Sequence, residues 1–370
     1  MARWSSLVLV VLAACGGGAA AGSNPATPPT ADAPSGGAAE APATKAAGPP
    51  TTLDCGDFTT CAIAKGGEIR CWGRGKAGEL GDGSGSDRPK HVAGPGIGNA
   101  VKLAMGSQFG CALLDDKSVK CWGTGRIAND GKALTSSRAV AVAGLGGVEE
   151  LVASGVIACA RSGGNVTCWG ADAASIGTPP KTSFVQIATG FTHACGLDAK
   201  GGVTCWGSGD WAPSSPLAKP SVSGAKQVVT GDRHACVVTK DKKVMCWGHN
   251  DAGQLGTKAD GDVHKPAAVA GIGSVAKLVV GEASTCAILE DGSARCWGQN
   301  SQGELGLGTK SSDERPGKLG ADGVSDVCLA SSHGCALGRN GAISCWGQNA
   351  HGQLGDGSKE SHITPVAVAW

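Results

Sequence analysis

The stretch that decides the fold is His234-Ala235-Cys236-Val237-Val238, followed ten residues after its cysteine by Cys246-Trp247-Gly248. Cys-Trp-Gly recurs at intervals of 50, 47, 37, 41, 50 and 49 residues. A repeat period in the forties with short strands is typical of a β-propeller rather than of a helical solenoid. The seven copies begin at Cys71, Cys121, Cys168, Cys205, Cys246, Cys296 and Cys345.

Each copy has a second cysteine nine or ten residues upstream, and the segment between the two predicts a β-hairpin. In the third copy, Gly163-Gly164 fits a two-residue primed turn, which places Cys159 opposite Cys168. The other copies have one residue more, which predicts a three-residue loop that ends in the left-handed region. That last position is glycine in four copies, whereas Lys117 and Lys242 would carry some backbone strain.

Paired cysteines across a hairpin predict disulfides in an exported protein, because disulfides persist in oxidising compartments. Metal binding is disfavoured, since the spacing lacks the recurring histidine partners of a zinc site. The expected pairs are Cys61–Cys71, Cys111–Cys121, Cys159–Cys168, Cys195–Cys205, Cys236–Cys246, Cys286–Cys296 and Cys335–Cys345. Cys55 and Cys328 fall in the first strands of the first and seventh copies and could close the ring. Their one-position offset leaves that pairing open.

The N-terminus reads as an export signal, with Arg3 before an apolar run at residues 7–12. Leu12-Ala13-Ala14-Cys15 resembles the lipobox of bacterial lipoproteins. The resemblance implies that residues 1–14 are removed and that Cys15 is diacylated, which attaches the chain to a membrane. A plain secretory signal with an incidental cysteine is the alternative.

Residues 15–52 contain the lipidation cysteine and an Ala/Pro/Gly-rich linker with almost no large apolar side chain. Such a segment buries too little surface to offset its ordering entropy, which predicts a disordered tether. The propeller is expected to occupy residues 53–370. Each repeat reads as an apolar strand, the cysteine hairpin, a glycine-rich loop and a proline-led strand. We therefore predict an all-β, seven-bladed propeller with four antiparallel strands per blade.

The repeat resembles that of the regulator of chromosome condensation family. The resemblance lies in His234-Ala235-Cys236-Val237-Val238, in Cys-Trp-Gly, and in Gly-Gln-Leu-Gly or Gly-Glu-Leu-Gly at 78–81, 253–256, 303–306 and 352–355. It covers residues 53–370 and implies the seven-bladed fold. The founding eukaryotic member is a nuclear exchange factor for a small GTPase that docks on chromatin. An exported, lipid-anchored, neutral chain fits neither role, so the fold is carried over and the exchange activity is not.

Composition narrows the function classes. The 370 residues include 62 Gly, which argues against a mainly helical chain, and the net charge of +1 argues against nucleic-acid binding. The motif tryptophans are expected in the core between blades. His193, His234 and His333 share one repeat position, where a structural role is favoured over a catalytic or metal-binding trio. No catalytic, cofactor-binding or metal-ligating arrangement stands out, and clustered carboxylates are not apparent.

Two copies are shortened, because the glycine-leucine-glycine loop is missing after Cys168-Trp169-Gly170 and Cys205-Trp206-Gly207. Blades 3 and 4 should therefore have a lowered rim. Trp211 lies in the altered loop of blade 4 and is a candidate partner contact, since exposed tryptophan is a common interface anchor. The alternative is that Trp211 fills the gap left by the missing loop.

These observations predict a non-catalytic lipoprotein of the bacterial cell envelope, lipid-anchored in the outer membrane or at the cell surface. Its monomeric propeller would bind an envelope or extracellular protein, or another ligand. The alternatives are an inhibitor of an extracellular enzyme and a polysaccharide-acting hydrolase or lyase. The absence of tyrosine weakens any glycan-binding role.

Overall fold

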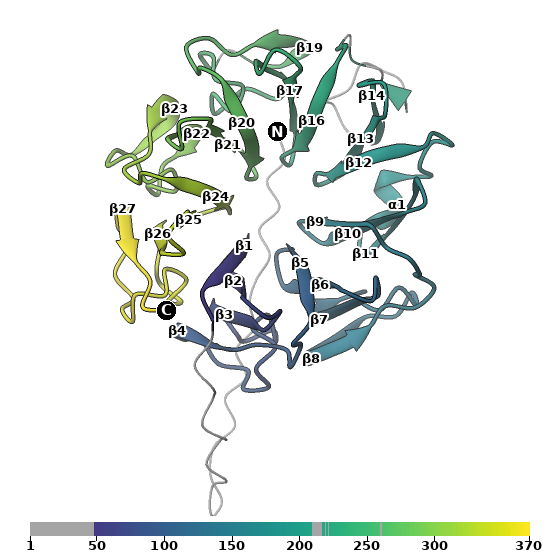
Figure 1. The fold of residues 1–370 in the computed structure, drawn as a ribbon, viewed down its shortest axis with the longest axis vertical. Coiled ribbons are helices and arrows are strands. Elements are labelled where there is room, and N and C mark those ends of the chain that lie inside the picture. Colours follow the sequence, from purple (N-terminus) through teal and green to yellow (C-terminus); the bar gives the residue numbers. More distant parts are fainter. Residues whose placement is uncertain (1–47, 209–216, 219, 221, 260) are drawn as a thin grey trace, which may run out of the picture. The chain divides into compact units, whose positions relative to one another are not determined.

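The computed structural model describes residues 48–208, 217, 218, 220, 222–259 and 261–370. The compact unit that contains the repeats spans Thr44–Trp370. Within it, seven antiparallel sheets stand around a central axis like the blades of a propeller (Figure 1). This arrangement confirms the predicted all-β, seven-bladed fold.

Strands follow the chain from the innermost to the outermost position of each blade. Blades 1 to 3 contain β1 (Pro50–Gly56), β2 (Thr59–Ala64), β3 (Ile69–Gly73), β4 (Arg88–Ala93); β5 (Ala100–Met105), β6 (Phe109–Leu114), β7 (Val119–Gly125), β8 (Leu134–Ala141); β9 (Glu150–Ser154), β10 (Ile157–Ser162), β11 (Asn165–Gly170). Blades 4 and 5 contain β12 (Phe184–Thr189), β13 (His193–Asp198), β14 (Val203–Gly207), β15 (Leu217–Ala218); β16 (Ala225–Thr230), β17 (His234–Thr239), β18 (Val244–Gly248), β19 (Val263–Ala268). Blades 6 and 7 contain β20 (Val275–Val280), β21 (Ser284–Leu289), β22 (Ala294–Asn300), β23 (Ser311–Lys318); β24 (Val324–Leu329), β25 (His333–Gly338), β26 (Ile343–Gly347), β27 (His362–Ala367).

Two details differ from the expected repeat. Blade 3 has three strands, and the short helix α1 (Ala173–Ile176) follows its third strand within the part of the chain that is described. Strand β1 begins at Pro50, so the first blade includes residues that the sequence pattern assigned to the linker 15–52. No helix among the described residues is long and apolar enough to cross a membrane.

The middle hairpin of every blade has the predicted register. Its two cysteines are direct cross-strand neighbours, as in the pairs Cys159–Cys168 and Cys236–Cys246. The turn residues Lys117 and Lys242 adopt φ values of 65° and 60°, the left-handed region in which the other copies use glycine. The backbone of this loop therefore imposes the unusual conformation on both lysines.

The core consists of seven layers, one between each pair of neighbouring blades. Every layer packs the hairpin cysteines of one blade against the motif tryptophan of the next, as with Cys61 and Cys71 against Trp122. The seven motif tryptophans are 0–3% exposed, which confirms the expectation that they are core residues.

The ring closes without any exchange of strands, because blades 1 and 7 each consist of four consecutive strands. A disulfide between Cys55 and Cys328 joins the innermost strands of these two blades. The Trp370 indole also donates a hydrogen bond of 2.9 Å to the Gly48 carbonyl across the same junction. Covalent closure thus takes the place of a shared strand.

Candidate functional site

The innermost strands of all seven blades line a central channel. The channel contains a cavity of about 300 Å³ whose wall carries charged and amide side chains. Three of these side chains bond to the backbone of the following blade: Asp54 accepts from the Met105 amide at 2.9 Å, and Glu150 accepts from the Ile187 amide at 2.9 Å. Gln186 bonds the Val228 backbone in the same way. The polar groups of this wall therefore hold neighbouring blades together.

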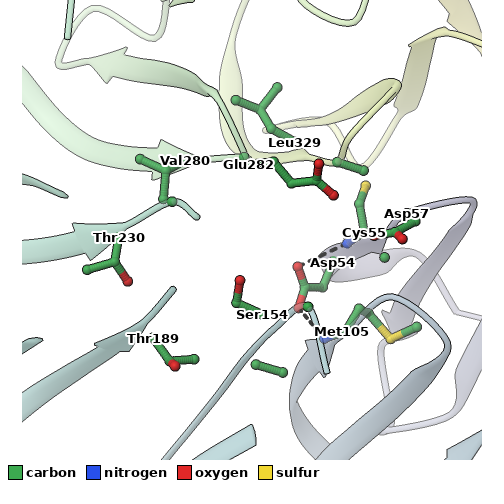
Figure 2. A pocket seen from close by; sticks show the side chains of 17 residues that line it. Asp54, Cys55, Asp57, Met105, Ser154, Thr189, Thr230, Val280, Glu282 and Leu329 are labelled. Atoms are coloured by element: carbon green, nitrogen blue, oxygen red, sulfur yellow. Dashed lines mark hydrogen bonds between the residues drawn. The ribbon is translucent and has the colours of Figure 1, made fainter. Parts of the chain in front are cut away.

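Three carboxyl groups gather at one mouth of the channel. Asp57, Asp232 and Glu282 each follow the glycine at the end of the innermost strand of blades 1, 5 and 6, and Figure 2 shows Asp57 and Glu282 in the lining of this mouth. The Asp232 amide donates to the Glu282 carbonyl at 3.0 Å, which ties the two turns together. The expectation of no carboxylate cluster was wrong, because closure of the ring brings together turns that are far apart in the chain.

Electrostatics at the mouth favour protonated carboxyl groups. Burial, followed by the negative charges of Asp232 and Asp57, raises the pKa of Glu282 to about 8. Burial and the charge of Asp57 raise the pKa of Asp232 to about 6. Burial also raises the pKa of Asp57, although a hydrogen bond from Ser107 opposes the shift. A protonated carboxyl group carries no charge and can share its proton with an ionised neighbour, so the mouth can hold several acids without full mutual repulsion.

Glu282→Gln should remove part of the pH dependence of stability. Because the folded-state pKa of Glu282 is raised to about 8, folding holds a proton that the unfolded chain has lost above its own pKa near 4.5. Stability from this group is therefore lost as pH rises toward 8. We expect the wild type to lose several degrees of melting temperature between pH 6.5 and 8.5, and Glu282→Gln to lose less. The exposed Glu360→Gln is the control, and equal slopes for both variants would contradict the assignment.

The three histidines of the shared repeat position are structural. His193, His234 and His333 are fully buried at the start of the second strand of their blades. The His234 Nε2 atom lies 3.1 Å from Thr285 Oγ1, and the His333 Nε2 atom lies 2.9 Å from Thr60 Oγ1, each across a blade junction. Burial lowers the pKa of all three, to about 3 for His193 and about 4 for the other two. These rings remain neutral and do not act as acid-base groups near pH 7.

The structure joins the same seven hairpin cysteine pairs that the sequence predicts. It also joins Cys55 to Cys328, with 5.5 Å between their Cα atoms, although their one-position offset had left this pairing open. Cys15 and the candidate contact Trp211 lie outside the described residues.

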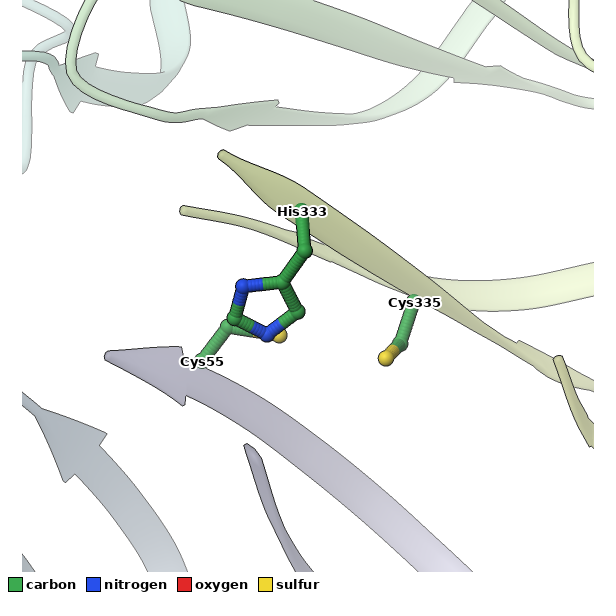
Figure 3. A group of neighbouring side chains, drawn as sticks. All are labelled: Cys55, His333 and Cys335. Carbon is green, nitrogen blue, oxygen red and sulfur yellow. The ribbon is translucent and has the colours of Figure 1, made fainter. Parts of the chain in front are cut away.

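One group of side chains has the composition of a metal site. Cys55, His333 and Cys335 present ligand-type atoms within 4.8 Å of one another (Figure 3). Both sulfurs belong to disulfides, and only a thiolate is a metal ligand. The His333 Nε2 atom already contacts Thr60. The group is therefore part of the ring closure in the oxidised protein.

A glycine-rich loop follows the third strand of several blades and leads to the fourth strand of the same blade. On the channel-mouth face it also contacts the next blade. A glutamate or glutamine carbonyl in each loop accepts a hydrogen bond from the motif tryptophan of the next blade, and the adjacent leucine is fully buried. The bonds are Trp72–Gln353 (2.9 Å), Trp122–Glu79 (2.7 Å), Trp297–Gln254 (3.0 Å) and Trp346–Glu304 (2.8 Å). The leucines are Leu80, Leu255, Leu305 and Leu354.

Blades 2 and 3 lack this loop, so the symmetry of the face is broken. Ile127 and Ile176 pack in the corresponding core layers in place of the leucine, and each comes from a shorter segment after its Cys-Trp-Gly motif. They are 2% and 1% exposed. The Nε1 atoms of Trp169 and Trp206 are buried without a hydrogen-bond partner among the described residues. The sequence pattern predicted the gap in blade 3 but missed the one in blade 2, whose overall length is normal. The loop predicted to be short in blade 4 falls largely in residues 209–216, which are not described.

A ring of disulfide-bonded blades whose polar channel groups bond between blades defines the class: an all-β, seven-bladed propeller. Comparison with protein families identifies the repeat. The regulator of chromosome condensation (RCC1) repeat matches residues 51–79, 100–126, 184–210, 225–254 and 275–304, and a second description of the same repeat matches 241–288. The chain therefore contains regulator of chromosome condensation repeats in its propeller. None of the curated sequences compared with it matches.

Solved structures share the fold at low identity. Prp20p from Saccharomyces cerevisiae, described with its binding to Gsp1p and histones, is 23% identical over 82% of this chain and 86% of its own, with a TM-score of 0.72. Yeast RCC1 (Prp20) bound to Kap60 is 21% identical over 92% and 91%, with a TM-score of 0.71. The ectodomain of the Physcomitrella patens receptor kinase CR4 is 21% identical over 81% and 74%, with a TM-score of 0.56.

Proposed function

We propose that this protein is an exported lipoprotein whose propeller binds another protein of the cell envelope or the extracellular space, without catalysis. The break in repetition on the channel-mouth face carries the proposal. Blades 2 and 3 lack the leucine loop there, and Phe191, in the neighbouring turn of blade 4, is 42% exposed. An exposed aromatic residue beside a recess is a common contact in protein interfaces.

Export is supported by the disulfides. All sixteen cysteines of the described residues are paired, and such a set persists only in an oxidising compartment. The lipobox-like Leu12-Ala13-Ala14-Cys15 supports attachment through a lipid on Cys15. The proteins of similar fold support a protein partner, since yeast Prp20 is described with Gsp1p, histones and Kap60.

Cross-linking in cells that produce the full chain tests the proposal. We expect the wild type to fractionate with membranes and to cross-link to one saturable protein partner, whereas Cys15→Ser should leave the membrane fraction. Phe191→Ala should reduce cross-linking severalfold without lowering the melting temperature, because the ring is exposed. Val185→Ala is the matched control, since Val185 is 51% exposed near the other end of β12, the strand that precedes Phe191. Equal capture by all variants would contradict a role for this face.

The carboxyl cluster favours one alternative, a polysaccharide-acting hydrolase or lyase. Such enzymes use a pair of carboxyl groups, one of them with a raised pKa, and Glu282 and Asp57 provide that chemistry. Turnover of a polysaccharide that is lost in Asp57→Asn would replace the binding role with this one.

A further inference from the structure

The junction between blades 2 and 3 contains an apolar cavity of about 200 Å³. Its lining includes Phe109, Ile127, Val156 and Trp169, and Arg126 lies at its rim. At this position four other junctions hold the leucine loop of the preceding blade. Ile127 fills part of the space that the leucine takes in those junctions, and the cavity is the part that stays open because blade 2 does not have the loop.

The cavity lacks a hydrogen-bond acceptor for the Trp169 indole. Its side chain is 3% exposed, and its buried Nε1 atom has no hydrogen-bond partner within the described chain. The equivalent Trp122 donates to the Glu79 carbonyl at 2.7 Å. A buried donor without an acceptor is costly, so a ligand that supplies a carbonyl oxygen here would gain a hydrogen bond that the free protein does not make.

Arg126 places a positive charge beside the cavity. Arg126 is exposed and forms no ion pair with the described residues. In blade 1 the guanidinium of Arg74 pairs with the Glu79 side chain of the leucine loop at 2.6 Å. An arginine beside the empty loop position therefore favours a glutamate before the leucine over a glutamine.

We propose that this cavity binds a glycine-flanked turn of the type Gly-Glu-Leu-Gly from a partner protein. The leucine would enter the apolar recess, a main-chain carbonyl would accept from Trp169 Nε1, and the glutamate would face Arg126. The molecule itself carries the template, because Gly78-Glu79-Leu80-Gly81 makes the first two of these contacts with Trp122 and its surroundings. The inference rests on the proposed binding function and names the chemistry of the partner.

A fluorescent cyclic peptide that contains Gly-Glu-Leu-Gly tests the proposal with the full chain. We expect saturable binding in fluorescence polarisation, and no binding of the Gly-Glu-Ser-Gly peptide. Trp169→Phe keeps an aromatic ring but removes the indole N–H donor, so it should weaken binding about tenfold. Arg126→Gln should remove the preference for glutamate over glutamine. The absence of saturable binding, or equal binding by Trp169→Phe, would overturn the proposal.

Melting temperatures separate recognition from folding. Trp169→Phe removes a donor that has no acceptor in the described structure, so it should lower the melting temperature only through reduced packing of the smaller ring. The matched Trp122→Phe breaks the bond to Glu79 and should lower it. If envelope partners are captured equally by wild type and Trp169→Phe, the binding function stands and this cavity is not its site. If nothing is captured but the peptide binds through Trp169, the cavity stands and the envelope function fails.

Discussion

Trp297→Ala should lower the free energy of unfolding by about 4 kcal/mol, as expected for a large aromatic residue removed from a core. The Trp297 side chain is fully buried and packs in one layer with Cys236, Cys246 and Leu255 of the preceding blade. Its indole also donates to the Gln254 carbonyl at 3.0 Å. The substitution therefore opens a cavity between blades 5 and 6 and leaves a buried carbonyl with one hydrogen bond fewer.

Trp297→Phe is the control that divides this loss into two parts. It retains much of the buried ring and removes the indole N–H, so we expect a loss of about 1–2 kcal/mol from the hydrogen bond and reduced packing. Denaturant unfolding of both variants measures the difference. A Trp297→Ala variant with an unchanged unfolding midpoint would show that the blade junction does not depend on this side chain.

The repeat made most of the fold predictable. Seven Cys-Trp-Gly copies, each with an upstream cysteine, determine the hairpin register, the inter-blade position of the tryptophan and the number of blades. Local turn chemistry was predictable for the same reason, down to the left-handed conformation of Lys117 and Lys242. Features shared by every repeat are visible in the sequence because each copy provides an independent observation of the same structural requirement.

Features that depend on the differences between copies were harder to predict. Blade 2 keeps a normal length, so its missing loop does not show as a shortened interval between Cys-Trp-Gly copies. Ile127 packs in the core layer where other blades use the leucine, but it lies at a different distance from the Cys-Trp-Gly motif than the leucine does. The pattern that could have shown the gap is the lack of Gly-Gln-Leu-Gly or Gly-Glu-Leu-Gly after Trp122.

The carboxyl cluster was missed because it exists only in the closed ring. Asp57, Asp232 and Glu282 occupy equivalent positions in three repeats, which was visible in the sequence. Their proximity depends on the radius of the channel and on which blades face one another across it. Neither quantity follows from the spacing of the repeat.

Loss of the disulfide that closes the ring should also lower the stability strongly. Replacing Cys55 and Cys328 together by alanine should lower the free energy of unfolding by about 5 kcal/mol in the chain-entropy description, because the bond closes a loop with a sequence separation of 273. The same description assigns about 3 kcal/mol to a hairpin bond such as Cys286–Cys296, whose separation is 10. The true hairpin contribution is smaller, since the hairpin already holds its ends together.

Covalent closure matters here because blades 1 and 7 share no strand. Without the bond, the junction is held by the contact between Thr60 and His333, by the hydrogen bond of 2.8 Å between His351 and Asp87, and by the Trp370 indole. These contacts keep the ring closed in the native state, so the double variant should still fold. They do not restrict the unfolded chain, which is where the long-range disulfide acts.

Denaturant unfolding of the Cys55→Ala/Cys328→Ala variant, beside the Cys286→Ala/Cys296→Ala variant, measures this difference. Both pairs are buried and lose the same two sulfur atoms, so their packing costs are matched. Hydrogen exchange should accelerate most in β1 and β24 of the ring-closure variant, because opening begins where no strand is shared. Equal loss of stability in the two variants, with exchange unchanged in β1 and β24, would contradict this prediction. It would mean that packing between blades 7 and 1 closes the ring and that the long-range bond adds no more stability than a hairpin bond.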